Sequence, residues 1–356
     1  MKARTRKLLA VTALPAIALA LALGTRAYSS STPPQPVLPI SLGPVDYLGS
    51  LRTPADVKGK PSRFRRLVNR IIGLDGDHRG MVSPQGVAVD AAGRILVADT
   101  RGQVVHMFDP AGRRYKQLHA PDSDPFLSPI AVALDSKGQI YVTDSGRSRI
   151  FVFRPDGKFL RTLGALGRNE SIFKRCTGLA IDRRRDVLYV VDTVAMRIVV
   201  LTTDGKVLER FGKRGDGPAE FNYPTYIAVD RDGTLWVVDS LNFRIQHLDA
   251  SGKFLAAFGQ IGDGVGQFDK PKGIAIDAQG RLLVVEGRYD RVQAYDPSGR
   301  LLFAFGQTGN APGDFFLPTG IALDSEGKIY VSDGQNGRVE IFRVNPGSQG
   351  GQPGAR

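Results

Sequence analysis

The residues of this chain that could carry chemistry are mainly acids and arginines, and they recur at a fixed spacing. An apolar run ends in an acid, and an arginine opens the next apolar run five residues later, as in Asp239 and Arg244. The same spacing joins Asp144 to Arg149, Asp192 to Arg197, Glu286 to Arg291 and Asp333 to Arg338. One such pair could be catalytic, but five copies favour a structural, charge-assisted hydrogen bond that pins a loop.

Histidine and cysteine are too scattered for a metal centre. Tetrahedral zinc needs three or four converging ligands, and the chain has one cysteine, Cys176, and four histidines, His78, His106, His119 and His247. His106 and His247 follow their preceding acids by seven and eight residues, which turns their side chains toward opposite faces of a sheet. The sequence therefore predicts no catalytic residues, no bound metal and no cofactor.

The acids belong to a sixfold repeat. Six apolar runs end in an aspartate, 45 to 48 residues apart, and a second acid follows nine or ten residues later. The first acids are Asp90, Asp135, Asp182, Asp230, Asp277 and Asp324, and the second are Asp99, Asp144, Asp192, Asp239, Glu286 and Asp333. A period in the forties indicates a propeller blade or a solenoid unit.

Each copy has the pattern of four short strands. In the fifth copy, β-branched and aromatic residues fill 272–277, 281–286, 291–295 and 300–306, with Gly280 and a Pro-Ser-Gly turn between them. A four-stranded sheet cannot bury both faces alone, so successive copies must stack around an axis. We therefore predict an all-β, six-bladed β-propeller.

The repeat resembles the NHL repeat of six-bladed β-propellers over residues 74–344. It carries Pro-x-Gly-Ile-Ala-Val-Asp-like runs followed by Asp-x-x-x-x-Arg, most clearly from Pro224 to Ile245 and from Pro318 to Val339. The departures are Cys176 for the proline and Arg185 for the turn glycine in copy three, and Val104 for the arginine in copy one. The resemblance implies a scaffold only, because lyases, RNA-binding modules and protein-docking platforms all use this fold.

The sixth copy lacks its outer strand, so an N-terminal segment must close the ring. The alternating segment 45–51 is the predicted closing strand, and 63–72, which has apolar residues at helical spacing, is predicted to be an inserted helix. The alternative is that 64–72 closes the ring.

The two ends of the chain differ in composition from the repeats. Residues 1–27 combine basic residues with an apolar run from Leu8 to Leu23, which predicts a cleaved signal peptide or, alternatively, a retained N-terminal anchor. Residues 28–43 are expected to form a flexible linker, 44–344 the propeller, and 345–356 a disordered tail. The expected location is therefore the periplasm or the extracellular space, with membrane anchoring if the signal is retained.

The basic surplus does not point to nucleic acid. The chain has a formal net charge of +13, of which the first 27 residues contribute five basic groups and no acid. Nucleic-acid binding needs a continuous basic face with stacking aromatics, whereas the Arg183–Arg185 cluster lies in a turn on the face opposite the inter-blade loops. The basic segment 62–73, with its apolar stripe, is an alternative contact with a membrane surface.

A binding site is expected where the repeats differ, on the face formed by the inter-blade loops. Aromatic, arginine and asparagine side chains there are typical of interfaces. The predicted binding residues are Arg101, Arg147, Tyr223, Tyr226, Asn242, Phe243, Lys272, Arg288 and Tyr289. The predicted function is a non-enzymatic exported scaffold that binds another envelope or extracellular protein, or a peptide or saccharide.

The alternative function is an enzyme, such as a lyase or lactonase, acting at the mouth of the central channel. If the resemblance extended to such a lyase, it would imply several histidines that hold zinc. If it extended to a lactonase-like propeller, it would imply acids at the inner strand entrances that hold calcium. This chain has Gln85, Ile130, Thr177, Thr225, Lys272 and Thr319 at those entrances.

Overall fold

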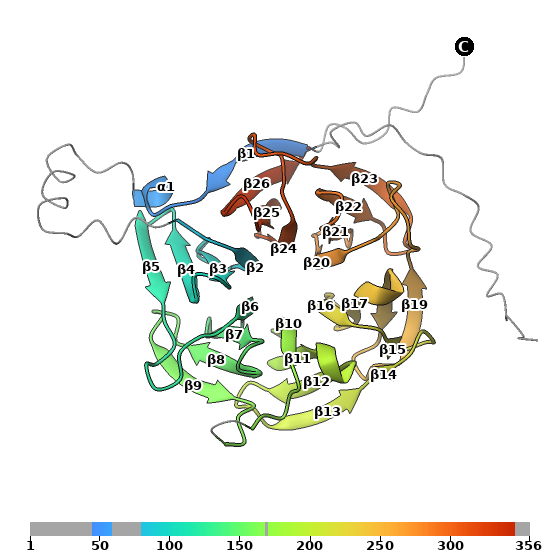
Figure 1. Cartoon of the computed structure of the whole chain (residues 1–356), viewed down its shortest axis with the longest axis horizontal. Coiled ribbons are helices and arrows are strands. Elements are labelled where there is room, and N and C mark those ends of the chain that lie inside the picture. The colour runs from blue at the N-terminus through green and yellow to red at the C-terminus, as the bar shows by residue number, and fades with distance from the viewer. Residues whose placement is uncertain (1–44, 59–79, 168–169, 346–356) are drawn as a thin grey trace, which may run out of the picture. The chain divides into compact units, whose positions relative to one another are not determined.

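A computed structural model describes residues 45–58, 80–167 and 170–345. Within this part, six four-stranded antiparallel sheets surround a central axis, and the first strand of each repeat is innermost (Figure 1). The prediction of an all-β, six-bladed propeller is confirmed. The predicted segments 1–27 and 28–43, the helix 63–72 and the tail from residue 346 onward lie outside the described residues.

The strands follow the repeat in chain order. Blade 1 contains β2 (Pro84–Val89), β3 (Ile95–Asp99), β4 (Val104–Asp109) and β5 (Arg114–Leu118). Blade 2 contains β6 (Pro129–Leu134), β7 (Ile140–Asp144), β8 (Arg149–Phe153) and β9 (Phe159–Leu163). Blade 3 contains β10 (Cys176–Asp182), β11 (Val187–Asp192), β12 (Arg197–Thr202) and β13 (Val207–Phe211).

The second half of the ring repeats the same order. Blade 4 contains β16 (Pro224–Val229), β17 (Leu235–Asp239), β18 (Arg244–Leu248) and β19 (Phe254–Phe258). Blade 5 contains β20 (Pro271–Ile276), β21 (Leu282–Glu286), β22 (Arg291–Tyr295) and β23 (Leu301–Phe305). Blade 6 contains β24 (Pro318–Leu323), β25 (Lys328–Asp333), β26 (Arg338–Val344) and β1 (Val45–Leu51). Outside the blades lie α1 (Ala55–Lys58), the 3-10 turns η2 (Thr193–Ala195) and η3 (Ser240–Asn242), and a parallel pair, β14 (Lys213–Arg214) with β15 (Glu220–Phe221).

The N-terminal strand closes the ring. β1 pairs antiparallel with β26, with Val45 opposite Val344 and Leu51 opposite Val339. The hydroxyl of Tyr47 donates to Oε2 of Glu340 at 3.1 Å, which adds a side-chain link between the first and last strands. Residues 45–51 therefore occupy the place predicted for them, and the alternative of 64–72 as the closing strand is wrong.

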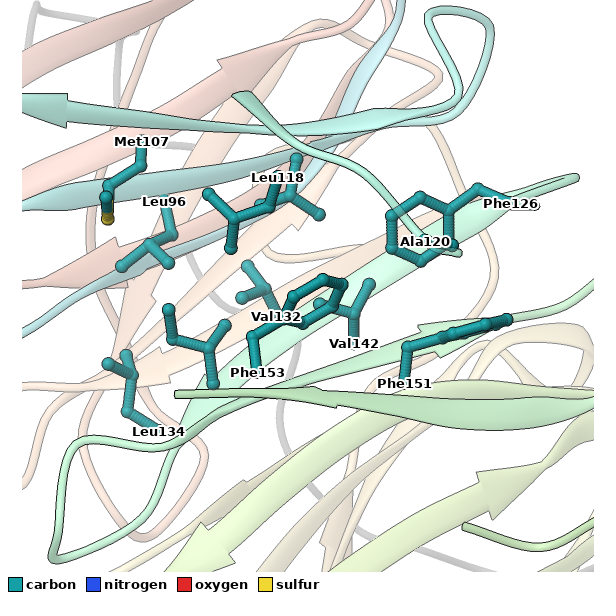
Figure 2. Packing of buried hydrophobic residues seen from close by; sticks show 12 residues of the cluster. Leu96, Met107, Leu118, Ala120, Phe126, Val132, Leu134, Val142, Phe151 and Phe153 are labelled. Carbon is teal, nitrogen blue, oxygen red and sulfur yellow. The ribbon is translucent and has the colours of Figure 1, made fainter. Parts of the chain in front are cut away.

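Adjacent blades pack face to face through apolar side chains. Between blades 1 and 2, Leu96 and Met107 of the first blade meet Val142 and Phe153 of the second, beside Phe126 from the connecting loop (Figure 2). The aromatic or methionine that precedes each inner strand is buried in all six copies: Met81, Phe126, Phe173, Phe221, Phe268 and Phe315. Burying each such side chain stabilises the fold by roughly 2 to 3 kcal/mol.

Around the axis the inner strands approach each other closely. A Cβ at Gly86 would lie 2.6 Å from the carbonyl oxygen of Ile130, and one at Gly273 would lie 2.6 Å from that of Thr319. Glycine is needed at these positions because the backbone of the next blade fills the space. Among the described residues, no helix is long and apolar enough to cross a membrane.

Candidate functional site

The recurring acid at the end of each second strand holds an inter-blade loop in place. Asp144 accepts backbone N–H groups of Leu127 and Ser128 in the preceding loop and of Gly146 and Arg147 in the following turn. Glu286 accepts those of Asp269, Lys270 and Arg288 in the same way. These buried carboxylates satisfy loop N–H groups that would otherwise be unpaired, which is a structural role.

Three of the five predicted acid–arginine pairs form as expected. The guanidinium and carboxylate are 3.2 Å apart in Asp192–Arg197 and 2.9 Å apart in Asp239–Arg244 and Asp333–Arg338.

The other two pairings are corrected by the structure. Arg149 places Nη1 2.8 Å from Oδ2 of Asp124 in the preceding loop, and Arg291 donates to the carbonyl oxygens of Asp263 and Gly264. In both blades the loop before the inner strand supplies a nearer acceptor, which the spacing between acid and arginine could not predict.

The histidines are separated. His106 is buried between Tyr115 and Asp99, and His119 is exposed. His247 stacks on Trp236 with ring centroids 3.9 Å apart, and His78 lies outside the described residues. Within the described ranges, no group of three or more His, Cys, Asp or Glu residues is arranged to hold a metal ion.

On the loop face, the residues nearest the central axis are described by four positions in each blade, which we call the rim. They are the two residues before each inner strand, the second residue of that strand, and the second residue after each recurring acid. Six of these positions are basic and one, Asp269, is acidic. The basic rim residues are Arg101, Lys174, Arg175, Lys270, Lys272 and Arg288.

Most rim cations have no acidic partner. Arg288 lies 3.6 Å from Asp269, and Arg175 makes a long contact of 3.5 Å with the hydroxyl of Tyr223. Within the described part of the chain, the side chains of Arg101, Lys174, Lys270 and Lys272 have neither an ion pair nor a hydrogen bond. The rim is therefore electropositive.

Exposed apolar side chains gather on the same face. Nine of the fifteen exposed large hydrophobic residues among those described lie in inter-blade loops or in turns that follow the recurring acids. They are Val82, Leu127, Leu166, Val194, Tyr223, Leu241, Ile261, Phe316 and Leu317. Seven of them are rim residues, and Phe316, Leu317, Val82 and Leu127 among these belong to three consecutive blades, 6, 1 and 2 (Figure 1).

Hydroxyl groups join neighbouring blades at the rim. The residue after the recurring acid donates to the carbonyl of the first residue of the next inner strand: Thr100 to Pro129 at 2.6 Å, Thr193 to Pro224 at 2.7 Å and Ser240 to Pro271 at 3.1 Å. The hydroxyls of Thr177 and Thr225 lie 2.6 and 2.7 Å from those of Thr193 and Ser240. Thr100, Thr193 and Ser240 therefore each link one blade to the next, and Thr177 and Thr225 contact two of these hydroxyls.

Blades 5 and 6 have glycine at the position after the recurring acid, and in blade 5 the glycine lies beside Lys272. Gly287 replaces the hydroxyl residue, and a Cβ there would lie 3.3 Å from both Cγ and Cε of Lys272. The carbonyl oxygen of Pro318 would be nearer still, at 3.1 Å, so the glycine leaves room both for the next inner strand and for the lysine stem. Burial lowers the pKa of Lys272, the charge of Lys270 lowers it further, and the carboxyl of Glu286 acts in the opposite direction. Burial also raises the pKa of Glu286, against the effect of its N–H donors.

The structure places four of the predicted binding residues on the rim, namely Arg101, Tyr223, Lys272 and Arg288. The comparison of the six copies with one another did not predict the exposed pair Phe316 and Leu317 or the cations Lys174, Arg175 and Lys270 as binding residues. The signal for them was present, because these positions directly precede the inner strands and vary between copies.

The remaining predicted residues are engaged within the protein. Asn242 donates to the carbonyl of Gly215 and to Asp239, and Arg147 contacts Asp124. Tyr226 and Phe243 pack against the apolar cluster between blades 4 and 5. Tyr289 lies under the guanidinium of Arg291, 5.1 Å from ring centroid to Cζ.

Comparison with known proteins agrees with the fold. The NHL repeat family matches residues 126–153 and 317–342, and a family described as 6-bladed beta-propeller matches 180–257. The chain is therefore a six-bladed β-propeller, and two of its blades match the NHL repeat. No curated protein matches the sequence.

Several solved structures share the fold at low sequence identity. A streptogramin B lyase is 15% identical with a TM-score of 0.55, over 74% of this chain and 94% of the lyase chain. Virginiamycin B lyase from Staphylococcus aureus, in a catalytically inactive form with quinupristin, is 16% identical with a TM-score of 0.54, over 74% and 95%. A chain of a nidogen–laminin complex is 21% identical with a TM-score of 0.52, over 64% and 84%. These similarities establish the architecture alone.

Proposed function

We propose that this propeller is a non-enzymatic, exported platform that docks another protein on its loop face. The observation that carries the proposal is the composition of the rim, where exposed apolar residues of blades 6, 1 and 2 adjoin cations that lack acidic partners. Apolar anchors supply binding energy, and the charges favour an acidic partner and speed its approach. The partner is therefore a protein segment that presents apolar side chains and carboxylates.

The arrangement favours binding over catalysis. General acid–base chemistry on a substrate at the mouth would need titratable groups that face one another there, and the rim carries a single acid, Asp269, which lies beside Arg288. The recurring acids are buried beneath the loops and accept backbone N–H groups. A lyase or lactonase activity at the mouth therefore finds no support in these side chains.

Site-specific photo-crosslinking tests the proposal. A photoreactive amino acid at Gln335, an exposed rim position, should give one discrete protein adduct in cells. The same amino acid at Ser325, exposed on the opposite face, should not. The adduct identified by mass spectrometry is then purified and its affinity for the propeller measured.

The rim variant Phe316→Ser/Leu317→Ser should weaken that affinity about tenfold or more, because exposed aromatic and aliphatic anchors carry interface energy. Leu208→Ser, which changes an exposed leucine on an outer strand, is the matched control. Equal affinity of the rim variant and the control would contradict the proposal. Binding of a saccharide instead of a protein would contradict protein docking and make the loop face a saccharide site.

A further inference from the structure

We propose that the ammonium group of Lys272 is the binding site for one carboxylate of the docked partner. The inference rests on the proposed function and makes it specific, since it names the chemical group that the partner places at the mouth of the axis.

Lys272 is the one charged residue at its position among the six copies. It is the second residue of an inner strand, where three other blades carry threonines, and the glycine at 287 leaves space for its stem. Its Cγ and Cε lie close to Gly287, so the methylene stem is held against blade 5. This is a fixed location for a cation, unlike that of a lysine free in solvent.

The charge at Lys272 is unsatisfied in the isolated propeller. The side chain is half-buried and, within the described part of the chain, has no hydrogen bond and no ion pair. A partly buried ammonium without a hydrogen-bonded partner is unfavourable, and Lys270 adds repulsion that the carboxyl of Glu286 opposes. A carboxylate arriving from outside would relieve both costs.

A carboxylate fits this site better than a larger anion. Lysine is a compact point charge, suited to a single oxyanion group. The apolar residues Phe316 and Leu317 belong to the neighbouring blade 6, so a ligand bearing both apolar and carboxylate groups would contact both. Such a carboxylate belongs either to an Asp or Glu side chain or to a chain terminus.

Three short peptides distinguish these sources: acetyl-Leu-Leu-Glu-amide, acetyl-Leu-Leu-Gln with a free carboxyl terminus, and the neutral acetyl-Leu-Leu-Gln-amide. Each is titrated into the full propeller with isotopically labelled lysine, and the Cε resonances are followed by NMR between pH 7 and 11. The Lys272 resonance is assigned through its loss in Lys272→Met, with Lys137→Met on the opposite face as the control.

A carboxylate peptide should raise the pKa of Lys272 by about one unit, as an opposite charge does at close range, and the neutral peptide should leave it unchanged. Which of the two charged peptides acts identifies the source. No change with either overturns the proposal, as does an equal change with the neutral peptide.

The aromatic resonances of Phe316 and Tyr223, followed in the same samples, separate this inference from the proposed function. If these rings respond to the peptides and Lys272 does not, the carboxylate site is wrong and the docking face stands. If Lys272 responds and the rings do not, the carboxylate site stands and the apolar docking face is contradicted.

Discussion

In blade 1, the imidazole of His106 contacts the recurring acid Asp99, a contact that an arginine makes in other blades. Its Nε2 lies 3.2 Å from Oδ2 of Asp99, and its Nδ1 lies 2.6 Å from the hydroxyl of Tyr115. Blade 1 has Val104 where the repeat calls for arginine. In blade 4 the residue equivalent to His106 is Gln246, which donates to Asp239 at 3.1 Å. In blades 1 and 4 this position thus contacts the recurring acid through different side chains, His106 and Gln246.

This equivalence predicts the effect of two substitutions. His106→Gln should preserve a donor to Asp99 and cost less than about 1 kcal/mol in unfolding free energy. His106→Phe should cost about 1 to 3 kcal/mol, because it leaves a buried carboxylate short of a donor. Blade 2 carries Phe151 at the equivalent position, so an aromatic ring fits there. Urea unfolding of both variants checks the difference, and equal losses would contradict the assigned role.

Asp99 also gives a pH dependence. Burial acts to raise its pKa, but His106 and the N–H groups of Val82, Gly102 and Ser83 outweigh burial, so the pKa is below its ordinary value. A carboxyl whose pKa is lower in the folded state stabilises the fold above its unfolded pKa of about 3.9, and that stabilisation is lost as the pH falls through the folded value. Asp99→Asn should therefore destabilise more at pH 7 than at pH 3.

Urea unfolding at both pH values measures that difference, and Asp122→Asn, in an exposed loop, controls for the loss of one negative charge. A destabilisation by Asp99→Asn that is as large at pH 3 as at pH 7 would show that the carboxylate form of Asp99 is not what stabilises the loop.

Ring closure predicts a sharp limit for N-terminal truncation. A chain that begins at Val45 keeps β1, whereas one that begins at Arg52 exposes the edge of β26 and removes Leu51 from the core. The second truncation should lose about 3 kcal/mol or more of unfolding free energy and tend to aggregate through its open edge. Thermal unfolding compares the two chains, and equal melting temperatures would contradict the closing role of β1.

The close approach of blades 6 and 1 makes Gly320 sensitive to a single methyl group. A Cβ there would overlap the carbonyl oxygen of Gln85 and lie 3.0 Å from Cα of Gly86. Gly320→Ala should therefore cost about 2 to 4 kcal/mol. At Gly167 the nearest atom to an added Cβ is 4.0 Å away, so Gly167→Ala should stay within about 1 kcal/mol. Chemical denaturation of the pair tests whether the axis is as tightly packed as these contacts imply.

The sequence predicted the fold because its signals are local and repeated. Turn glycines, alternating apolar residues and a constant period specify each blade, and the incomplete sixth copy indicated that 45–51 must pair with the last strand. Partners of individual side chains were less predictable. The guanidinium of Arg149 reaches Asp124 in the preceding loop, and the geometry of that loop does not follow from the spacing between acid and arginine.

Tyr226 illustrates the same limit for the candidate site. It occupies a position where most copies have glycine, so it was expected to project from the loop face. In the structure it packs between blades 4 and 5, and burial raises the pKa of its hydroxyl. The inner strands have irregular register between the first and fourth residues, as at Pro224 and Ile227, and strand alternation cannot predict side-chain direction across such a shift.

The stability of the Lys272→Met variant should show whether Lys272 is retained for structure or for binding. Met keeps the stem that packs at Gly287 and removes an unpaired charge. Lys272→Met should therefore unfold at the same temperature as the wild type or be more stable by up to about 1 kcal/mol, as is common where function opposes stability. A lysine retained for structure would instead lower the melting temperature when replaced.

The pH dependence of unfolding distinguishes the wild type from Lys272→Met. Because the pKa of Lys272 is lowered in the folded state, the folded protein binds fewer protons than the unfolded chain as the pH rises toward the unfolded pKa of about 10.4. The wild type should therefore gain stability relative to Lys272→Met between pH 7 and pH 10. Thermal unfolding across that range measures the gap, with Lys137→Met as the control for an exposed lysine. A gap that stays constant, or that widens in favour of the methionine variant, would show that the ammonium of Lys272 is already satisfied in the free propeller.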